Sequence, residues 1–387
     1  MNIRLPLFLV SMALSGARAA DVRDVDALIK ALRSAMPGDV IRVAPGTYSG
    51  GISLSGIKGS AQASVKLTAA DPKQPPVIEG GASGLHLSGC SHVEISHIKF
   101  TGAKANGLNI DDAGQPGSAR GIVLRDIIVT GTGPEGNRDG IKLSGVDTFL
   151  VERCRVEAWG TGGSGIDMVG CHDGQVRQCV FERDAAGYAR ALQSNGVQMK
   201  GGSARVVVQR CRFIRAGGRG VNLGGSTGAD YMRPMETDAE ARRLTVEDCY
   251  FEDVMAPVAF VGVDEAKVQF NTIVRPGKWA LRILQENRDP KFVPCRKGIF
   301  RNNIIVFRSD SLGEAVNIGP GTEPGSFTFA HNLWFCEDKP EESQRRIRLP
   351  VKEQNGQYGA DPQLYAATGH STMPNCIAGI RDEKKPQ

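Results

Sequence analysis

The chain has 387 residues, a length that ordinarily suggests two or three domains, and its formal net charge at pH 7 is a modest +5. This charge is compatible with an acidic partner, and we expect no nucleic-acid partner. Glycine occurs 48 times, which fits a fold that turns after every short strand.

The N-terminus has the features of a secretory signal peptide. A basic start at Arg4 precedes the apolar run Leu5–Leu14, and Ala17 and Ala19 form a small-residue cleavage site. The apolar run is too short to cross a bilayer, and no other stretch of the sequence is a candidate membrane span. We therefore predict that residues 1–20 are removed and that the chain is exported, either to the periplasm or outside the cell.

A short amphipathic helix is predicted over residues 24–35. Val25, Leu28 and Leu32 recur on one face, and Pro37 follows the last periodic residue. A solenoid needs a cover over its open end, so we expect this helix to be an N-terminal cap.

A glycine-flanked strand pattern then repeats along the chain. Its clearest copy is Gly140-Ile141-Lys142-Leu143-Ser144-Gly145, in which buried apolar residues flank one variable position that faces outward. Down the chain the outward position holds His86, Asn109, Lys142, Asp167, Gln198, Asn222, Ala259, Arg282 and Asn317.

A second strand pattern, such as Val176-Arg177-Gln178-Cys179-Val180-Phe181, recurs in step with the first at intervals of roughly 22 to 38 residues. Two or more short strands per repeat, with no helical pattern between them, predict an all-β fold. We expect a single-stranded right-handed parallel β-helix over residues 21–340 and an irregular segment over residues 341–387.

One position of the second pattern carries small polar residues, which predicts an internal ladder at a bend with about 4.8 Å between neighbours. Its expected members are Ser96, Asp126, Cys154, Cys179, Cys211, Cys249, Asn271, Asn303 and Asn332. We expect the four cysteines to be reduced, because stacked neighbours are poorly placed for disulfides. A pair such as Cys295–Cys336 stays open, as does the pairing of Cys376.

Long connections follow Val129, Phe181, Gly225 and Leu284, and loops of this length in a tight solenoid are often functional. The third is the longest and the most charged. We expect such loops to wall a groove on the outward face of the first strand pattern.

Mixed charge is concentrated on the middle rungs of that face. The catalytic candidates are Lys142, Lys200, Arg219 and Asp167, and the substrate-binding candidates are Asp139, Gln198, Asn222, Tyr231, Arg233 and Arg282. A solvated polar sheet face is the competing interpretation, and Lys142 with Asp167 can form a simple surface ion pair.

The sequence resembles the parallel β-helix polysaccharide lyases. The run from Asp26 to Tyr48 is similar to the opening of the chondroitinase B/alginate lyase family, and many exported β-helix proteins share it. The segment 139–145 is similar to one in a pectate lyase family whose lysine acts as the base, which implies that role for Lys142. The chondroitinase B family draws an arginine from a strand that here carries Asn222 instead.

The resemblance implies that a monomer binds an acidic, uronate-containing polysaccharide and cleaves it by β-elimination. A cation, either arginine or Ca²⁺, neutralises the uronate carboxylate, and a lysine with a lowered pKa removes the C5 proton. The sequence shows no convincing calcium ligand set. Two alternatives stay open: a glycoside hydrolase that uses Asp139 and Asp167, and a non-catalytic exported β-helix that binds glycan or protein.

Overall fold

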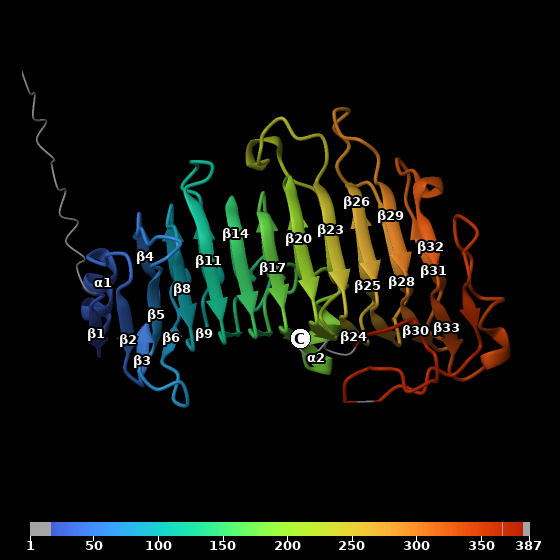
Figure 1. Cartoon of the computed structure of the whole chain (residues 1–387), viewed down its shortest axis with the longest axis horizontal. Coiled ribbons are helices and arrows are strands. Elements are labelled where there is room, and N and C mark those ends of the chain that lie inside the picture. Colours follow the sequence, from blue (N-terminus) through green and yellow to red (C-terminus); the bar gives the residue numbers. More distant parts are fainter. Residues whose placement is uncertain (1–16, 366, 382–387) are drawn as a thin grey trace, which may run out of the picture.

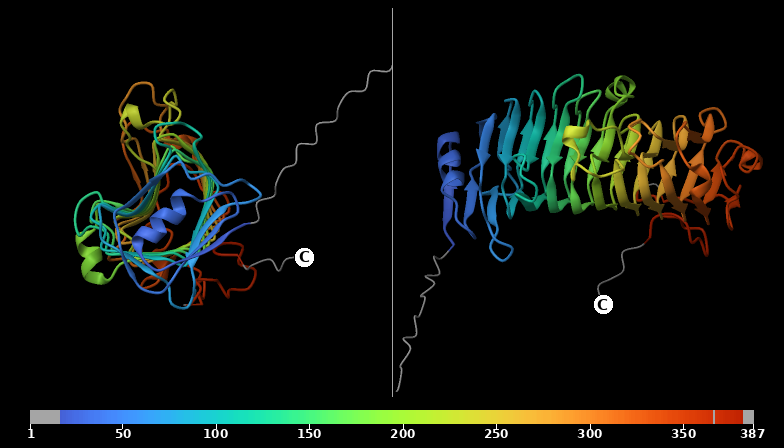
Figure 2. Two further views of the ribbon diagram at one scale, coloured as in Figure 1. Left: turned by 90° about the vertical axis from the view of Figure 1, so that its left-hand side faces the viewer. Right: turned by 90° about the horizontal axis from the view of Figure 1, so that it is seen from above.

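A computed structural model describes residues 17–365 and 367–381. Most of the predicted signal peptide, residues 1–16, lies outside the described residues. The described chain coils around one long axis, and seen along that axis three parallel sheets enclose a roughly triangular core (Figures 1 and 2). No helix in the described ranges is long and apolar enough to cross a membrane.

Most coils contribute one strand to each of the three sheets, here named sheets A, B and C. Sheet A contains β1 (Ala19–Val22), β2 (Val40–Val43), β5 (Val65–Ala69), β8 (Val93–Ser96), β11 (Ala119–Arg125), β14 (Val146–Glu152), β17 (His172–Arg177), β20 (Ser203–Gln209), β23 (Ala241–Glu247), β26 (Val263–Gln269), β29 (Arg296–Arg301) and β32 (Thr328–Ala330).

Sheet B is made of shorter strands. It contains β3 (Thr47–Ser49), β6 (Val77–Glu79), β9 (Lys99–Thr101), β12 (Ile128–Thr130), β15 (Arg155–Glu157), β18 (Val180–Glu182), β21 (Arg212–Ile214), β24 (Tyr250–Glu252), β27 (Thr272–Val274), β30 (Ile304–Phe307), β33 (Leu333–Cys336) and β34 (Gln357–Tyr358). The β-helix was expected to end near residue 340, whereas β34 pairs with β33 beyond that point.

Sheet C is the glycine-flanked pattern of the sequence. It contains β4 (Ile52–Ser55), β7 (Ser83–Ser88), β10 (Asn106–Asp111), β13 (Asp139–Ser144), β16 (Ser164–Val169), β19 (Asn195–Lys200), β22 (Arg219–Gly224), β25 (Ala256–Val261), β28 (Trp279–Leu284) and β31 (Glu314–Ile318). The right-handed parallel β-helix predicted from the two strand patterns is therefore the observed architecture.

Helices are few and lie outside the coil. The helix expected over residues 24–35 is α1 (Val25–Arg33), which begins at the side-chain cap of Asp24. Leu28 and Leu32 are buried in the main core, and α1 lies across the N-terminal end in Figure 2. The remaining helical segments are α2 (Ala185–Arg190), η1 (Ala229–Tyr231), η2 (Pro324–Ser326) and η3 (Pro340–Glu342).

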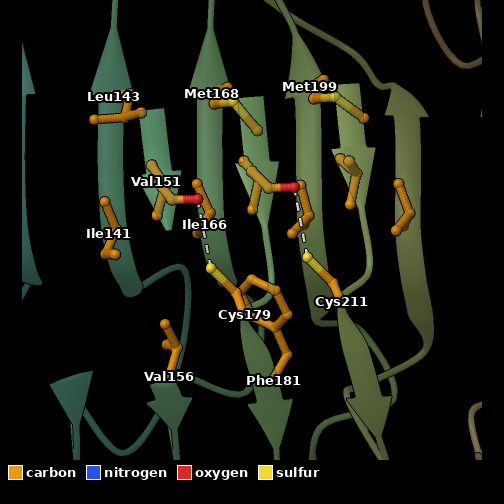
Figure 3. Close-up of a cluster of buried hydrophobic side chains, with 14 of the residues drawn as sticks. Ile141, Leu143, Val151, Val156, Ile166, Met168, Cys179, Phe181, Met199 and Cys211 are labelled. Carbon is orange, nitrogen blue, oxygen red and sulfur yellow. Dashed lines mark hydrogen bonds between the residues drawn. The ribbon is translucent and has the colours of Figure 1, made fainter. Parts of the chain in front are cut away.

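Equivalent residues of successive coils stack inside the solenoid. Phe181, Phe213 and Phe251 form a column with ring centroids 4.9 and 4.8 Å apart. Beside it, the thiol of Cys179 donates to the carbonyl of Val151 at 3.6 Å (Figure 3). All nine cysteines are free thiols, as expected for Cys154 and the three cysteines stacked on it.

The predicted internal ladder is confirmed from Cys154 to Asn332, but the prediction is wrong for its first two members, Ser96 and Asp126. The β11–β14 register pairs Arg125 with Glu152, so the residue level with Cys154 is Ile127 rather than Asp126. By the same register Ile98, not Ser96, occupies this position one coil earlier.

Asp126 stands instead in the turn between sheets A and B, where one residue per coil adopts a left-handed conformation with φ between 51° and 58°. Aspartate tolerates this conformation better than most residues. The turn residues are His97, Asp126, Arg153, Gln178, Arg210, Asp248, Phe270, Asn302 and His331.

Candidate functional site

The outward row of sheet C has the register predicted from the sequence. Asn109 pairs with Lys142, Lys142 with Asp167, and Asp167 with Gln198. The row continues through Asn222, Ala259, Arg282 and Asn317. Because parallel rungs lie about 4.8 Å apart, side chains on adjacent rungs can contact each other directly.

Four charged residues form one cluster in the middle of this row. The ammonium group of Lys142 forms an ion pair with Asp167 and lies 3.7 Å from Asp139. Lys200 approaches the other oxygen of Asp167, with Nζ at 3.9 Å from Oδ1. The carboxylates are buried, with side-chain exposures of 4% for Asp139 and 2% for Asp167, whereas the lysines retain 22% and 19%. The cluster therefore presents two lysine side chains to solvent above two buried carboxyl groups.

Burial and charge set the protonation states of the cluster. Burial, reinforced by the negative charge of Asp167, raises the pKa of Asp139 to about 6. Burial alone would lower the pKa of Lys142, but Asp167 and Asp139 outweigh it, so the pKa is raised. Lys142 consequently remains a cation at neutral pH and is a poor base.

The pKa of Asp139 predicts a pH-dependent stability. Its folded-state pKa of about 6 lies above the ordinary value of 3.8, so the folded chain holds this proton more tightly than the unfolded chain. The resulting stabilisation is fully present below pH 3.8 and is lost as the pH rises through about 6. We expect Asp139→Asn to gain stability relative to the wild type as the pH is raised over this window.

Urea denaturation of both proteins at a series of pH values measures this difference. Titrating groups that lie away from Asp139 cancel because they are common to both chains. A difference in unfolding free energy that does not change with pH would contradict the raised pKa.

A first cleft of about 400 Å³ opens beside the cluster. Its lining includes Lys142 and Lys200 from sheet C, and Tyr231 and Arg233 from the loop between β22 and β23. The guanidinium group of Arg233 donates to the buried carboxylate of Asp112 at 3.1 Å, across 121 residues of sequence. This bond ties the loop to the end of β10, while the Tyr231 ring remains 68% exposed.

A buried carboxylate joins this loop to the next long one. Glu240 is fully buried and accepts hydrogen bonds from Gly201 N, Thr227 N and Oγ1, and Asn287 Nδ2, at 2.7 to 3.1 Å. The loops after β22 and β28 stand together at one edge of the solenoid in both views (Figures 1 and 2). Glu240 therefore fixes two walls of the groove relative to each other.

A second cleft of about 560 Å³ adjoins the first, and Asn137 and Lys200 line both. Arg219, from the start of β22, donates to Asn222 at 3.1 Å and forms an ion pair with Glu286. The further lining residues used below are Gln198, Trp279 and Arg282.

Arg282 extends the positive charge of the second cleft. Its guanidinium group lies 4.4 Å from the centroid of the Trp279 ring and donates to Asn317 at 2.9 Å. Burial and the nearby charge of Arg219 lower its pKa. The two clefts together form a groove along the middle of sheet C, with cations at several points on its floor.

Most of the predicted site residues meet in this groove, but three, Asp139, Asp167 and Asn222, are buried and do not face it as expected. Asn222 is completely buried, and its amide is engaged by Arg219 and the Gly224 carbonyl, so it orients Arg219 rather than contacting a substrate. Asp167 is buried beneath the lysines. Lys142 and Arg282 line different clefts, as their five-rung separation predicts.

The sequence analysis missed Asn137, Glu240 and Glu286. All three belong to the long loops that were singled out, so loop length was the available signal. Their individual roles depend on contacts between distant segments, which strand periodicity does not encode.

The groove does not fit a calcium ion. Within residues 17–365 and 367–381, no three His, Cys, Asp or Glu side chains are grouped closely enough to hold a metal. The buried carboxylates Asp139 and Asp167 already share the ammonium group of Lys142. A divalent cation at this point would meet a positive charge rather than a free ligand set.

Comparisons with known proteins agree on the architecture. Residues 77–233 and 117–296 match the family model described as a right handed beta helix region, which together is more than half of the chain. No curated protein matches this sequence.

Three solved structures illustrate the similarity in fold. The PL6 family polysaccharide lyase Pedsa3628 from Pseudopedobacter saltans is 14% identical, with a TM-score of 0.55, 95% of this chain covered and 97% of that one. Alginate lyase from Paenibacillus sp. is 15% identical, with a TM-score of 0.53 and coverage of 80% and 99%. Pectate lyase Pel9A is 13% identical, with a TM-score of 0.51 and coverage of 81% and 80%. At these identities the likeness extends to the fold alone.

Proposed function

The chain belongs to the right-handed β-helix family, and we propose that it binds a uronate-containing polysaccharide in the sheet C groove and cleaves it by β-elimination. The observation that carries this proposal is the pair of lysines, Lys142 and Lys200, that meet at buried Asp167 on the wall of one cleft. The names of the structural neighbours, an alginate lyase, a pectate lyase and a polysaccharide lyase, support the same substrate class.

The geometry divides the roles between the two lysines. Lys142 is held as a cation by two carboxylates and is suited to neutralise the uronate carboxylate as charge develops. Lys200 has the longer contact to Asp167 and lines both clefts, so we assign it as the base. Lys200 takes the C5 proton, the C4–O4 bond breaks as the C4–C5 double bond forms, the departing O4 takes a proton from solvent water, and Lys200 returns its proton to solvent.

Substrate binding would extend along the groove. Arg219 and Arg282 in the second cleft supply cations for neighbouring uronates, and Gln198, on the same strand as Lys200, lines the same cleft. Trp279 offers a ring beside Arg282. As part of this proposal the chain is exported, since a polysaccharide is encountered outside the cytoplasm.

The hydrolase alternative is less well supported. A glycosidase needs one carboxyl group at the glycosidic oxygen and a second on the other side of the bond. Here Asp139 and Asp167 are both buried and contact the same lysine, so neither is free to reach a sugar. The non-catalytic binder makes the same use of the groove and is separated from the lyase by the experiment below.

Ultraviolet absorbance of the unsaturated uronate tests the proposal. The protein is incubated with alginate, pectate and glycosaminoglycans, with and without Ca²⁺, beside Lys142→Ala and Lys200→Ala. We expect a rise on at least one polymer that falls about 100-fold or more in Lys200→Ala. Lys66→Ala, an exposed lysine on sheet A, serves as the matched control and should behave as the wild type.

Two results would overturn the proposal. New reducing ends without absorbance would indicate the hydrolase. Neither signal on any polymer would indicate a binding protein.

A further inference from the structure

A separate cleft of about 1070 Å³ lies on the sheet B side of the loops that wall the groove. Its lining includes Thr130 at the end of β12, Arg155 on β15, and Arg190 on α2. The loop between β12 and β13 divides the two sites, because Pro134 lines this cleft while Asn137 lines the groove. No part of the proposed reaction uses this second site.

An arginine without a carboxylate partner lies in the wall of this cleft. Arg183 is only 5% exposed, and its guanidinium group lies 4.0 Å from the centroid of the Trp159 ring. Nη2 donates to the Gly160 carbonyl at 3.1 Å, whereas Nε has no hydrogen-bond acceptor. Among the described residues no carboxylate forms an ion pair with Arg183, and burial lowers its pKa to about 10.

Most of the acidic residues that line this cleft are already engaged, and the remaining one, Glu135, is exposed on the loop between β12 and β13. Glu157 and Glu182 both pair with Arg155, and Glu182 also lies 3.8 Å from Arg215. The side chain of Asp184 caps α2 by accepting from Gly187 N at 2.6 Å. A buried charge is ordinarily paired, because its desolvation is costly otherwise. Arg183 is thus a cation in the wall of an open cleft that has the charge of Asp184 nearby but, among the described residues, no carboxylate in an ion pair with it.

We propose that this cleft is a second ligand site, at which Arg183 binds the carboxylate of an acidic sugar residue. A guanidinium group presents several donors in a fixed plane that matches a carboxylate, and the Trp159 ring and the Gly160 bond hold that plane in place. The choice of a sugar acid rests on the proposed function, whereas the need for an oxyanion rests on Arg183 alone. Such a site would hold a segment of polymer that is not being cleaved.

Equilibrium binding tests the site without any turnover. Calorimetric titrations use glucuronate and galacturonate, with inorganic sulfate and neutral glucose as comparison ligands, on the Lys200→Ala protein. We expect uronate binding that weakens about 10-fold or more when Arg183→Gln is added, and no binding of glucose. Arg190→Gln, an exposed arginine of the same cleft, is the matched control and should change the affinity by less than about threefold.

A second variant guards against a folding defect in Arg183→Gln. Thr130→Trp places a bulky ring in the cleft without altering Arg183 and should weaken uronate binding to a similar degree. Uronate affinity that is unchanged in both variants, or the absence of uronate and sulfate binding, would overturn the site. Sulfate binding without uronate binding would overturn the sugar-acid assignment. Because the assay measures no cleavage, its failure is distinct from a failure of the proposed lyase.

Discussion

Replacing Asp167 by alanine should remove polymer cleavage and destabilise the folded chain together. The carboxylate is buried, pairs with Lys142 and lies 3.9 Å from Lys200, so its loss leaves two lysines facing each other above the floor of the cleft. Removing one partner of a buried ion pair costs about 3 kcal/mol of unfolding free energy. Because both lysines lose the group that positions them, we expect the elimination rate to fall about 100-fold or more.

The chain offers a matched control on another sheet. Asp264 on β26 is also buried, with 6% of its side chain exposed, and it contacts Arg296 at 3.0 Å, Lys297 at 3.6 Å and Arg242 at 3.7 Å. Asp264→Ala should therefore lose comparable stability and keep its activity, since sheet A does not face the groove. Urea denaturation and the absorbance assay separate the two effects. Wild-type cleavage by Asp167→Ala would show that the lysine pair is not the reaction site.

The architecture could be predicted because the same local strand pattern recurs from coil to coil. Each sheet C strand alternates buried and outward residues between glycines, so the row from His86 to Asn317 follows from the sequence alone. The ladder could be predicted only where hydrogen-bonding side chains fill it. In the coils that contain Ile98 and Ile127 the ladder position is apolar. The sequence pattern therefore assigned the position to a neighbouring polar residue, such as Asp126.

The composition of the site was partly predictable for the same reason. Lys142, Asp167 and Gln198 are brought together by register, which strand spacing determines. The walls were not predictable, because they depend on contacts such as Arg233 with Asp112 and Asn287 with Glu240. Such contacts form between loops whose conformations depend on the folded chain, so no local sequence pattern predicts them. The burial of Asn222 likewise arises from packing around Arg219 rather than from its place in the strand.

The second large effect is expected in the ladder itself, on Asn303→Ala. Asn303 is fully buried, and its side-chain oxygen Oδ1 accepts from the backbone N and the side-chain Nδ2 of Asn271, both at 3.0 Å. Its amide donates to Val268 O at 3.1 Å and Asn332 Oδ1 at 3.0 Å. Alanine leaves Asn271 N without its acceptor, whereas Asn271 Nδ2 keeps Val246 O and Gln269 O and Asn332 Oδ1 keeps the backbone N–H of residue 303. Because an unsatisfied buried donor costs about 1–3 kcal/mol and each further lost bond costs about 1 kcal/mol, we expect a loss of about 4 kcal/mol.

Cys211→Ala is the matched truncation, because Cys211 occupies the same ladder position three coils earlier. Its sulfur makes long contacts, 3.5 Å to Val176 O and 3.3 Å to Gln209 O, and the backbone N–H of Cys211 reaches Cys249 Sγ at 3.5 Å. We expect a loss of about 1 kcal/mol there, near that of deleting a small buried group. Urea denaturation gives both values, and hydrogen exchange at Asn271 N should rise only in Asn303→Ala, because coils contact only their neighbours. Equal losses in the two variants would mean that the asparagines contribute packing volume rather than hydrogen bonds, and the change from cysteine to asparagine along the ladder would then carry no energetic meaning.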